Sequence, residues 1–257
     1  MKKILFISTR NPYSGRYSGD VIRSFKIINV LKRKYQVDLI YLGEKKNIRS
    51  KNLNAKSFGH PNYLIKFFYC LVCLIKVEPI QYGLFFSKSM KKYIEDNALN
   101  YDIMFFHHIR SSQYLPDNYQ GKTVLDMGDL YSENYAQTFK YLNFFNPLKY
   151  IYYVESVIVK RIEKKIFSSF DKVLLFSKSE VAKVKKKFSN VIQINESVDK
   201  IHNKLLYSPK NFRILFLGNL NYLPNILACK EFIYSVIPRL VKFLPDLKFY
   251  VIGNKTS

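Results

Sequence analysis

Acidic residues are scarce in this 257-residue chain, which has 19 Asp and Glu against 42 Lys and Arg and a formal net charge of +23. A field of that sign favours polyanions such as nucleic acid, anionic lipid or phosphorylated ligands. The basic residues are dispersed and form no arginine-rich arm, which argues against a dedicated nucleic-acid binder. The abundance of Lys, Ile, Asn, Tyr and Phe is also typical of an AT-rich genome, and genome bias explains the charge equally well.

Cysteine is also scarce, with three residues in the chain. Cys70 and Cys73 form a C-x-x-C pair inside an apolar run, and Cys229 stands alone. A zinc site would need two further ligands at suitable spacing. We therefore expect no bound metal and three reduced cysteines in the core, as is usual in a reducing cytoplasm.

A long apolar run is missing as well. The strongest candidate, Tyr63–Val77, is interrupted by Lys66 and Lys76, and it falls far short of the ~20 apolar residues of a spanning helix. The first residues resemble a signal peptide, but Arg10 breaks the apolar core, so they favour a strand instead. The sequence predicts a chain without a membrane span that lies at most on a membrane surface.

Short apolar runs alternate with helical patterns along the chain, which predicts an α/β fold with a parallel sheet. The polar stretch 199–211 predicts a boundary between an N-terminal domain, 1–205, and the start of a second one, 206–257. The predicted strands are Ile4–Ser8, Val37–Leu42, Tyr101–Phe106, Thr123–Asp126, Lys172–Phe176, Val191–Asn195, Phe212–Leu217 and Lys248–Ile252. The predicted helices are Asp20–Lys34, Tyr63–Val77, Lys88–Asn97, Tyr131–Tyr141, Leu148–Phe167, Lys178–Lys187 and Pro224–Phe243.

The loop after the first strand contains Gly15 and Gly19 and leads into the helix that starts at Asp20. The N–H groups of such a helix start are free to meet an anion. The spacing is not G-x-G-x-x-G, so the dinucleotide fingerprint is absent. A plain strand–helix connection explains the same pattern, and both interpretations stay open.

Polar residues follow two further strands. His107, His108 and Arg110 come after the strand Tyr101–Phe106, and Asp126 and Asp129 close the strand near 123–126. The carboxyl ends of strands in open α/β sheets face the ligand crevice, so these residues are candidate ligand contacts. The alternatives are a surface histidine in a loop and a simple helix cap from Asp129 or Ser132. Residues 121–123 lack the context of a P-loop, and 126–129 is not a metal-binding D-x-D.

The segment 140–167 is both aromatic and basic. One face of such a helix suits an anionic bilayer, whereas a core-packed helix with a solvated basic face explains the pattern equally simply. We favour membrane contact for Tyr141–Tyr153 and core packing for Val154–Phe167.

Taken in order, these motifs resemble the GT-B glycosyltransferases of the large retaining family 4, close to the sugar transferases of polysaccharide and O-antigen gene clusters. The resemblance is carried by "RNPYSGRYSGDVIRSFKIINVL", "YDIMFFHHIRSSQYL", "VLDMGDLYSENY", "VESVIVKRIEKKIFSSFDKVLLFSKSEVAKVKK" and "ILFLGNLNYLPNILACKEFIYSVIPRLVKFLPDLKFYVIG". It implies one complete Rossmann-like N-terminal domain and the first β-α-β piece of a second Rossmann-like domain.

The resemblance also implies roles. A nucleotide-sugar donor would give its sugar, with retention and without a bound metal or cofactor, to a glycan or lipid-linked acceptor at the inner face of the cytoplasmic membrane. The implied catalytic residue is His107. The implied donor-binding residues are Gly19, Asp20, Gly218, Asn219 and Asn221, and the implied acceptor-binding residues are Arg23, His108, Arg110 and Asp126.

Two departures from the family pattern matter. The stretch "NESVD", Asn195 to Asp199, stands where the family often has "NGVD". The family's basic diphosphate-binding residue and its E-x7-E pair would follow Ser257, so the pattern predicts a truncated transferase. The alternative is an inactive fragment that binds an acceptor or a membrane. We also expect residues 212–257 to be less stable than 1–198.

Overall fold

The computed structural model describes residues 1–15, 18–44, 48, 50–195 and 212–253. The chain divides into two compact units, Met1–Glu196 and Ser197–Ser257. The predicted domain boundary at 205/206 falls in a stretch outside the described residues. Among the described residues, no helix has the length and apolar character needed to cross a membrane.

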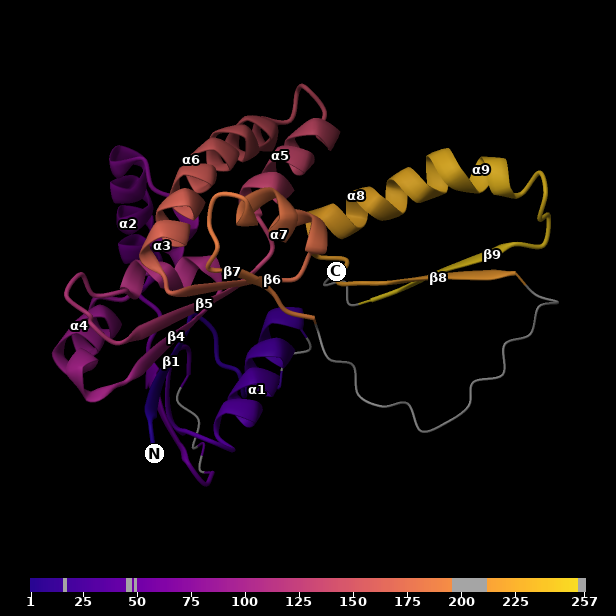
Figure 1. Ribbon diagram of the computed structural model, residues 1–257. Coiled ribbons are helices and arrows are strands. Elements are labelled where there is room, and N and C mark those ends of the chain that lie inside the picture. The colour runs from indigo at the N-terminus through magenta and orange to yellow at the C-terminus, as the bar shows by residue number, and fades with distance from the viewer. Residues whose placement is uncertain (16–17, 45–47, 49, 196–211, 254–257) are drawn as a thin grey trace. The chain divides into compact units, whose positions relative to one another are not determined.

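The first unit is built on a seven-stranded sheet of parallel strands in the order β3-β2-β1-β4-β5-β6-β7. Figure 1 labels β1, β4, β5, β6 and β7 of this sheet. This order extends that of a Rossmann sheet, in which β2 and β3 are added on one side of β1 and the later strands on its other side. The strands are β1 (Lys3–Ser8), β2 (Gln36–Leu42), β3 (Leu53–Phe58), β4 (Ile103–His107), β5 (Lys122–Gly128), β6 (Lys172–Leu175) and β7 (Val191–Gln193).

Helices cover both faces of this sheet, as the parallel-sheet prediction requires. Ile28 of α1 packs with Phe6 and Phe105 on one face. Met90 of α4 and Val159 of α6 belong to the core of the other face. The helices of this unit are α1 (Gly19–Leu31), α2 (Tyr63–Lys76), α3 (Ile80–Leu84), α4 (Lys88–Asn97), α5 (Tyr131–Tyr141), α6 (Pro147–Ser169) and α7 (Lys178–Lys185), with short 3-10 turns η1 (Ala98–Asn100) and η2 (Ile109–Tyr114).

At the start of helix α5, Ser132 is not the cap that the sequence offered as one alternative, because it donates to a residue of another helix. Ser132 does not accept from the helix backbone; its amide and hydroxyl both donate to the carboxyl group of Glu163 on α6, with the amide at 3.0 Å. The N-cap residue is Leu130, and it makes no side-chain cap bond. Burial raises the pKa of Glu163 to about 7, because the charged form loses its hydration.

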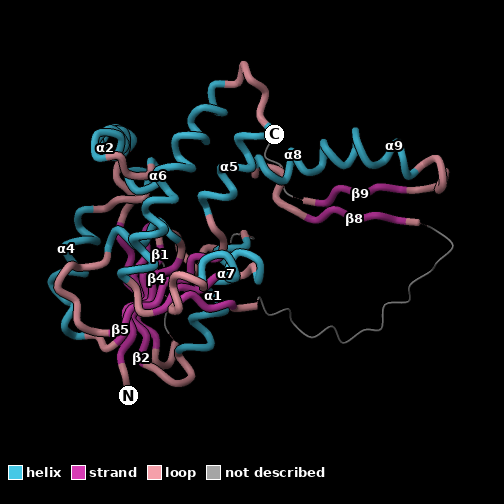
Figure 2. Tube along the Cα trace, turned by 45° about the horizontal axis from the view of Figure 1, so that its top comes forward, coloured by secondary structure: helices cyan, strands magenta, loops and turns pink. Residues whose placement is uncertain are grey.

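The second unit contains a parallel pair, β8 (Arg213–Leu217) and β9 (Lys248–Ile252), joined by α8 (Leu223–Glu231), a π-helical segment (Phe232–Val236) and α9 (Ile237–Leu240). The single helix predicted over Pro224–Phe243 is therefore interrupted. Pro238 explains the break: it has no N–H, and its ring clashes with a regular preceding turn. Figure 2 shows the helical segments along one face of the pair, where Phe232 packs on Phe249 at 4.9 Å between ring centroids.

The other face of this strand pair is open. Leu215, Leu217 and Tyr250 are exposed, and only Cys229 is fully buried among residues 212–253. All three cysteines are free thiols, as predicted, although Cys70 is half-buried rather than buried.

Candidate functional site

The candidate site of the first unit lies at the carboxyl ends of β1, β4 and β5. The strand register places Ser8 beside His107 and His107 beside Asp126. His107 is the last residue of β4 and not part of the loop predicted after it, and Asp126 lies inside β5, as its predicted strand implied. Both side chains are buried. Parallel register therefore brings together two ionisable residues that are far apart in sequence.

Asp126 and Arg23 form a buried bidentate ion pair at this edge. The Nε and Nη2 atoms of Arg23 each donate to one carboxylate oxygen at 2.7 Å. Burial alone would raise the pKa of Asp126, but hydrogen bonds from His107 and Arg23 outweigh it and lower that pKa. Asp126 is therefore an anion at neutral pH, and a planar guanidinium facing it in this way is held in one orientation.

Phe176, the residue after β6, covers the same guanidinium group. The Cζ atom of Arg23 lies 4.0 Å from the centre of the Phe176 ring. Gly128 makes this possible: its φ is +85°, and a Cβ there would lie 3.1 Å from the ring. A side chain at position 128 would be strained and would displace the ring, so this glycine fixes the wall of the site.

His107 is held at both ring nitrogens. Nδ1 lies 3.0 Å from Oδ2 of Asp126, and Nε2 lies 2.9 Å from the main-chain oxygen of Asp20. A carbonyl oxygen only accepts, so Nε2 is the donor in the second contact. His107 thereby ties the sheet edge to the first turn of α1.

Asp20 lies in that first turn and forms ion pairs with two more arginines. Its Oδ2 lies 2.8 Å from Nη1 of Arg10 and 3.4 Å from Nη2 of Arg110. Burial opposes ionisation, but Arg10, Ser18, Arg110 and His107 together lower the pKa of Asp20. Gly19 begins the helix in open space, and the N-cap residue Ser18 makes no side-chain cap bond.

Arg110 of η2 and His108, the residue before η2, complete the cluster. Arg110 donates to Thr9 Oγ1, and burial followed by repulsion from Arg10 lowers its pKa to about 10, which leaves it cationic at neutral pH. His108 has a φ of 78° and lies within 2.7 Å of the Tyr131 hydroxyl. Burial and the neighbouring cations hold the pKa of His108 well below its usual value, so its ring is neutral.

The structure thus brings all seven predicted residues of the first unit together. Arg23, Asp126 and Arg110 are buried. Arg23 pairs with Asp126, and Arg110 pairs with Asp20. The Arg10 side chain, in contrast, is 46% exposed. Arginines 10, 23 and 110 outnumber aspartates 20 and 126, and the start of α1 adds partial positive charge. The arrangement suits an anion that reaches the exposed guanidinium of Arg10. The sequence analysis missed Arg10, although Arg10 closely follows the end of β1 and could have been found in that way. It also missed Phe176, because nothing in the sequence indicates that this ring packs on Arg23.

The three predicted residues of the second unit also lie together, in the loop between β8 and α8. Asn219 Oδ1 accepts from the Asn221 amide at 2.9 Å, and Asn225 Nδ2 donates to the Asn219 carbonyl at 3.0 Å. Gly218 donates to Ile252 at 3.0 Å, and a Cβ there would lie 2.9 Å from Asn225. The loop is a defined turn that leads into a helix start.

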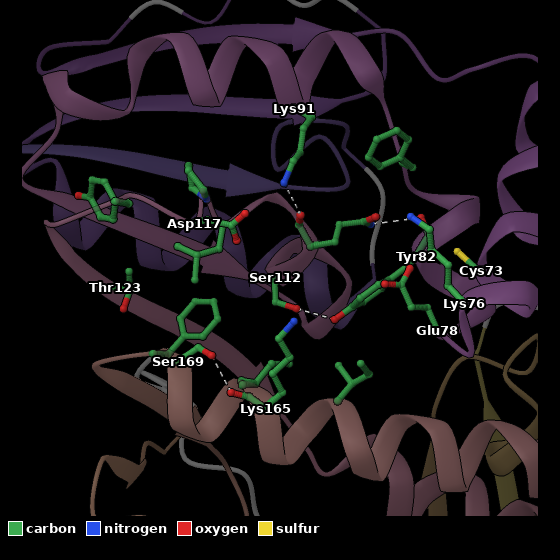
Figure 3. Close-up of a pocket in the computed structure, with 18 of the residues that line it drawn as sticks. Cys73, Lys76, Glu78, Tyr82, Lys91, Ser112, Asp117, Thr123, Lys165 and Ser169 are labelled. Atoms are coloured by element: carbon green, nitrogen blue, oxygen red, sulfur yellow. Dashed lines mark hydrogen bonds between the residues drawn. The ribbon is translucent and has the colours of Figure 1, made fainter.

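A separate pocket of about 700 Å³ lies on the first unit between α2, η2 and α6. The connection from β4 to β5 runs through η2, and Ser112 and Gln113 of η2 line the pocket. Figure 3 shows Lys76, Lys91 and Lys165 around it together with Glu78 and Asp117. With Asp171, which also lines it, the pocket has three carboxylates against its three lysines. The Tyr82 and Ser112 hydroxyls are bonded to each other at 2.7 Å. None of the predicted site residues lines it.

Within the described parts of both units, no group of three or more His, Cys, Asp and Glu side chains is arranged to hold a metal ion. No family model matches the chain. An uncharacterised 44.6 kDa protein in the cps region of Klebsiella pneumoniae is 26% identical over 267 residues. The match covers 99% of this chain and 65% of that protein, so the chain spans less than two thirds of the length of this relative.

Solved structures resemble the chain in fold. A crystal structure of TarM matches 100% of this chain and 72% of its own with a TM-score of 0.53 and 12% identity. Arabidopsis thaliana UGT89C1, complexed with UDP-L-rhamnose, matches 100% of this chain and 70% of its own with a TM-score of 0.51 and 10% identity. These are GT-B glycosyltransferases. The chain therefore has an α/β fold of the GT-B type, as the sequence predicted.

Proposed function

We propose that this protein is a glycosyltransferase that moves a sugar, with retention, from a nucleotide-sugar donor to a glycan or lipid-linked acceptor in cell-surface polysaccharide synthesis. The observation that carries the proposal is the cluster of three arginines around Asp20 and Asp126 at the carboxyl edge of a GT-B type sheet. The relative in a cps region supports the polysaccharide context. We place the reaction at the cytoplasmic side of the membrane.

The cationic edge suits the departing nucleoside diphosphate. Arg10 and the start of α1 offer it a guanidinium group and free N–H groups, which stabilise developing negative charge without a metal ion. The buried pair of Arg23 and Asp126 holds this edge rigid. Chelation with EDTA should therefore leave turnover unchanged.

His107 is the proposed residue at the reacting centre. Both of its ring nitrogens are engaged, so contact with a sugar requires Nε2 to exchange the Asp20 carbonyl for a sugar hydroxyl. Asp126 would keep the ring oriented during that exchange. On the donor side, the proposed contacts are Gly19, Asp20 and the loop with Gly218, Asn219 and Asn221; on the acceptor side they are Arg23, His108, Arg110 and Asp126.

The test compares two matched variants of the full-length protein. Arg10→Gln removes a part-exposed cation paired with Asp20 at the carboxyl edge; Lys122→Gln removes one paired with Asp171, 2.9 Å away, at the opposite end of β5. Release of nucleoside diphosphate from a panel of nucleotide sugars is measured with a membrane extract as acceptor source. We expect Arg10→Gln to lower the rate roughly 10²-fold and Lys122→Gln to leave it unchanged.

Two results would contradict the proposal. One is the absence of acceptor-dependent release with every donor from protein that is shown to be folded. The other is an equal loss in both variants, because the opposite edge of the sheet has no part in the proposed chemistry.

A further inference from the structure

Helix α2 presents an apolar face to solvent although it is firmly attached to the first unit. Leu64 is 81% exposed, Phe67 64% and Ile75 83%, and Phe68 and Leu71 are exposed as well. In the whole helix only Cys73 is buried. A monomer rarely leaves so much contiguous apolar surface uncovered, and such a face marks an interaction site.

The attachment of α2 shows that this exposure does not come from a loose segment. The helix has an Asn62 cap at its start, with a 2.9 Å bond from the Ile65 amide. Gly83 of α3 packs against its backbone so closely that a Cβ there would lie 2.6 Å from the Cys70 nitrogen. Arg161 of α6 donates to the Val77 carbonyl at the other end. The apolar face is a fixed feature of the surface.

A second apolar group stands on the turn between α5 and α6. Tyr141, Phe144 and Phe145 are exposed, with Phe145 at 89%. Leu148 and Ile151 continue this group along the first turns of α6. The turn is ordered: Asn143 accepts from the Phe145 amide at 3.0 Å, and Asn146 caps α6. In Figures 1 and 2 this turn and α2 lie on the same side of the seven-stranded sheet.

Lysines predominate among the charged residues around both groups, although Glu78 follows α2 and lines the pocket together with Lys76. Residues 57–77 and 136–154 contain Lys66, Lys76, Lys140 and Lys149 but no Asp or Glu. Glu155 comes next along α6, but it is buried and accepts from the Ile80 amide. Aromatic rings with lysines beside them match the boundary between headgroups and acyl chains, where long cationic side chains reach out to phosphate.

We infer that the α2 face and the α5–α6 turn together dock the protein on a bilayer that carries anionic headgroups. We call these two groups the docking surface: Leu64, Phe67, Phe68, Leu71 and Ile75 on α2, and Tyr141, Phe144, Phe145, Leu148 and Ile151 on the turn and α6. A second copy of the chain fits less well, because two such surfaces face to face bring like charges together in a protein of net charge +23. The sequence predicted membrane contact for Tyr141–Tyr153, which includes the turn. The structure adds the exposed apolar face of α2 to this docking surface.

The docking needs no sugar donor, so it is tested apart from the proposed function. Flotation of the full-length protein is measured with vesicles of phosphatidylcholine alone and with vesicles containing 30% phosphatidylglycerol. The variants are Phe67→Ser with Phe68→Ser on α2, and Phe145→Ser on the turn. Leu99→Ser is the matched control, since Leu99 is 89% exposed on η1, outside the docking surface.

We expect binding to the anionic vesicles only, weakened roughly tenfold or more by the α2 double variant and several-fold by Phe145→Ser, through loss of inserted apolar surface. Leu99→Ser should bind like the unaltered protein. The inference is overturned if the anionic vesicles do not bind the folded protein, or if the control loses as much binding as the α2 variant. It is also overturned if the protein is a stable dimer that the α2 variant dissociates, which would make a second copy the occupant.

Discussion

The buried contact between Arg23 and Asp126 makes a quantitative prediction. The substitution Asp126→Asn keeps the volume of the side chain and removes its charge. Asp126 is 2% exposed and accepts two bonds from Arg23 and faces His107. The variant leaves a buried guanidinium without a counter-ion. Breaking a buried pair from one side costs about 3–5 kcal/mol, a large part of the ~5–15 kcal/mol that a domain has in total.

The assay is urea unfolding at pH 7, with Glu95→Gln as the control. Glu95 pairs with Lys91 on the surface of α4 at 3.6 Å, and loss of such a pair costs less than ~0.5 kcal/mol. A double-mutant cycle with Arg23→Met adds a second check: the double variant should be at least ~1 kcal/mol more stable than Asp126→Asn alone. A cost below ~1 kcal/mol for Asp126→Asn would refute the claim that this pair organises the site.

Three further predictions concern stability. The pKa of Glu163 is raised to about 7 in the folded protein, so its contribution to stability is fully present below the unfolded value near 4.5 and is lost as pH rises through 7. This group should make the free energy of unfolding lower at pH 8 than at pH 5 by up to ~3 kcal/mol, and Glu163→Gln should remove that part of the difference. Gly83→Ala should destabilise the first unit by roughly 1–3 kcal/mol, because the added methyl group meets the Cys70 backbone, whereas Gly59→Ala, in open space, should change the unfolding midpoint little. Amide hydrogen exchange should be faster in residues 212–253, where one sheet face is open, than in the strands of the first unit; uniform protection would contradict this reading.

The fold was largely predictable because its strands are uninterrupted apolar runs. All eight predicted strands are present, with ends shifted by at most two residues. The strand Leu53–Phe58 was missed, because an edge strand with only Leu53 and Phe58 buried carries a weak pattern. Helix α3 was missed because its five residues are too few to show a helical repeat of apolar residues.

The site was predictable only as a set of strand ends. The sequence placed His107 and Asp126 near the same edge, but the register that makes them neighbours is a property of the assembled sheet. The stack of Phe176 on Arg23 and the contact of Glu163 with Ser132 join residues that no local pattern connects. The ion pair of Arg10 with Asp20 is local, and a closer reading of charge at the first strand end would have found it.

The measurement that tests the central claim most directly is the anomeric configuration of the sugar product. The full-length protein is incubated with its best nucleotide-sugar donor and acceptor, and the new glycosidic bond is followed by proton NMR as it forms. The account predicts that the product keeps the configuration of the donor. A product of inverted configuration, or no glycosidic product from folded protein with any donor, would contradict it.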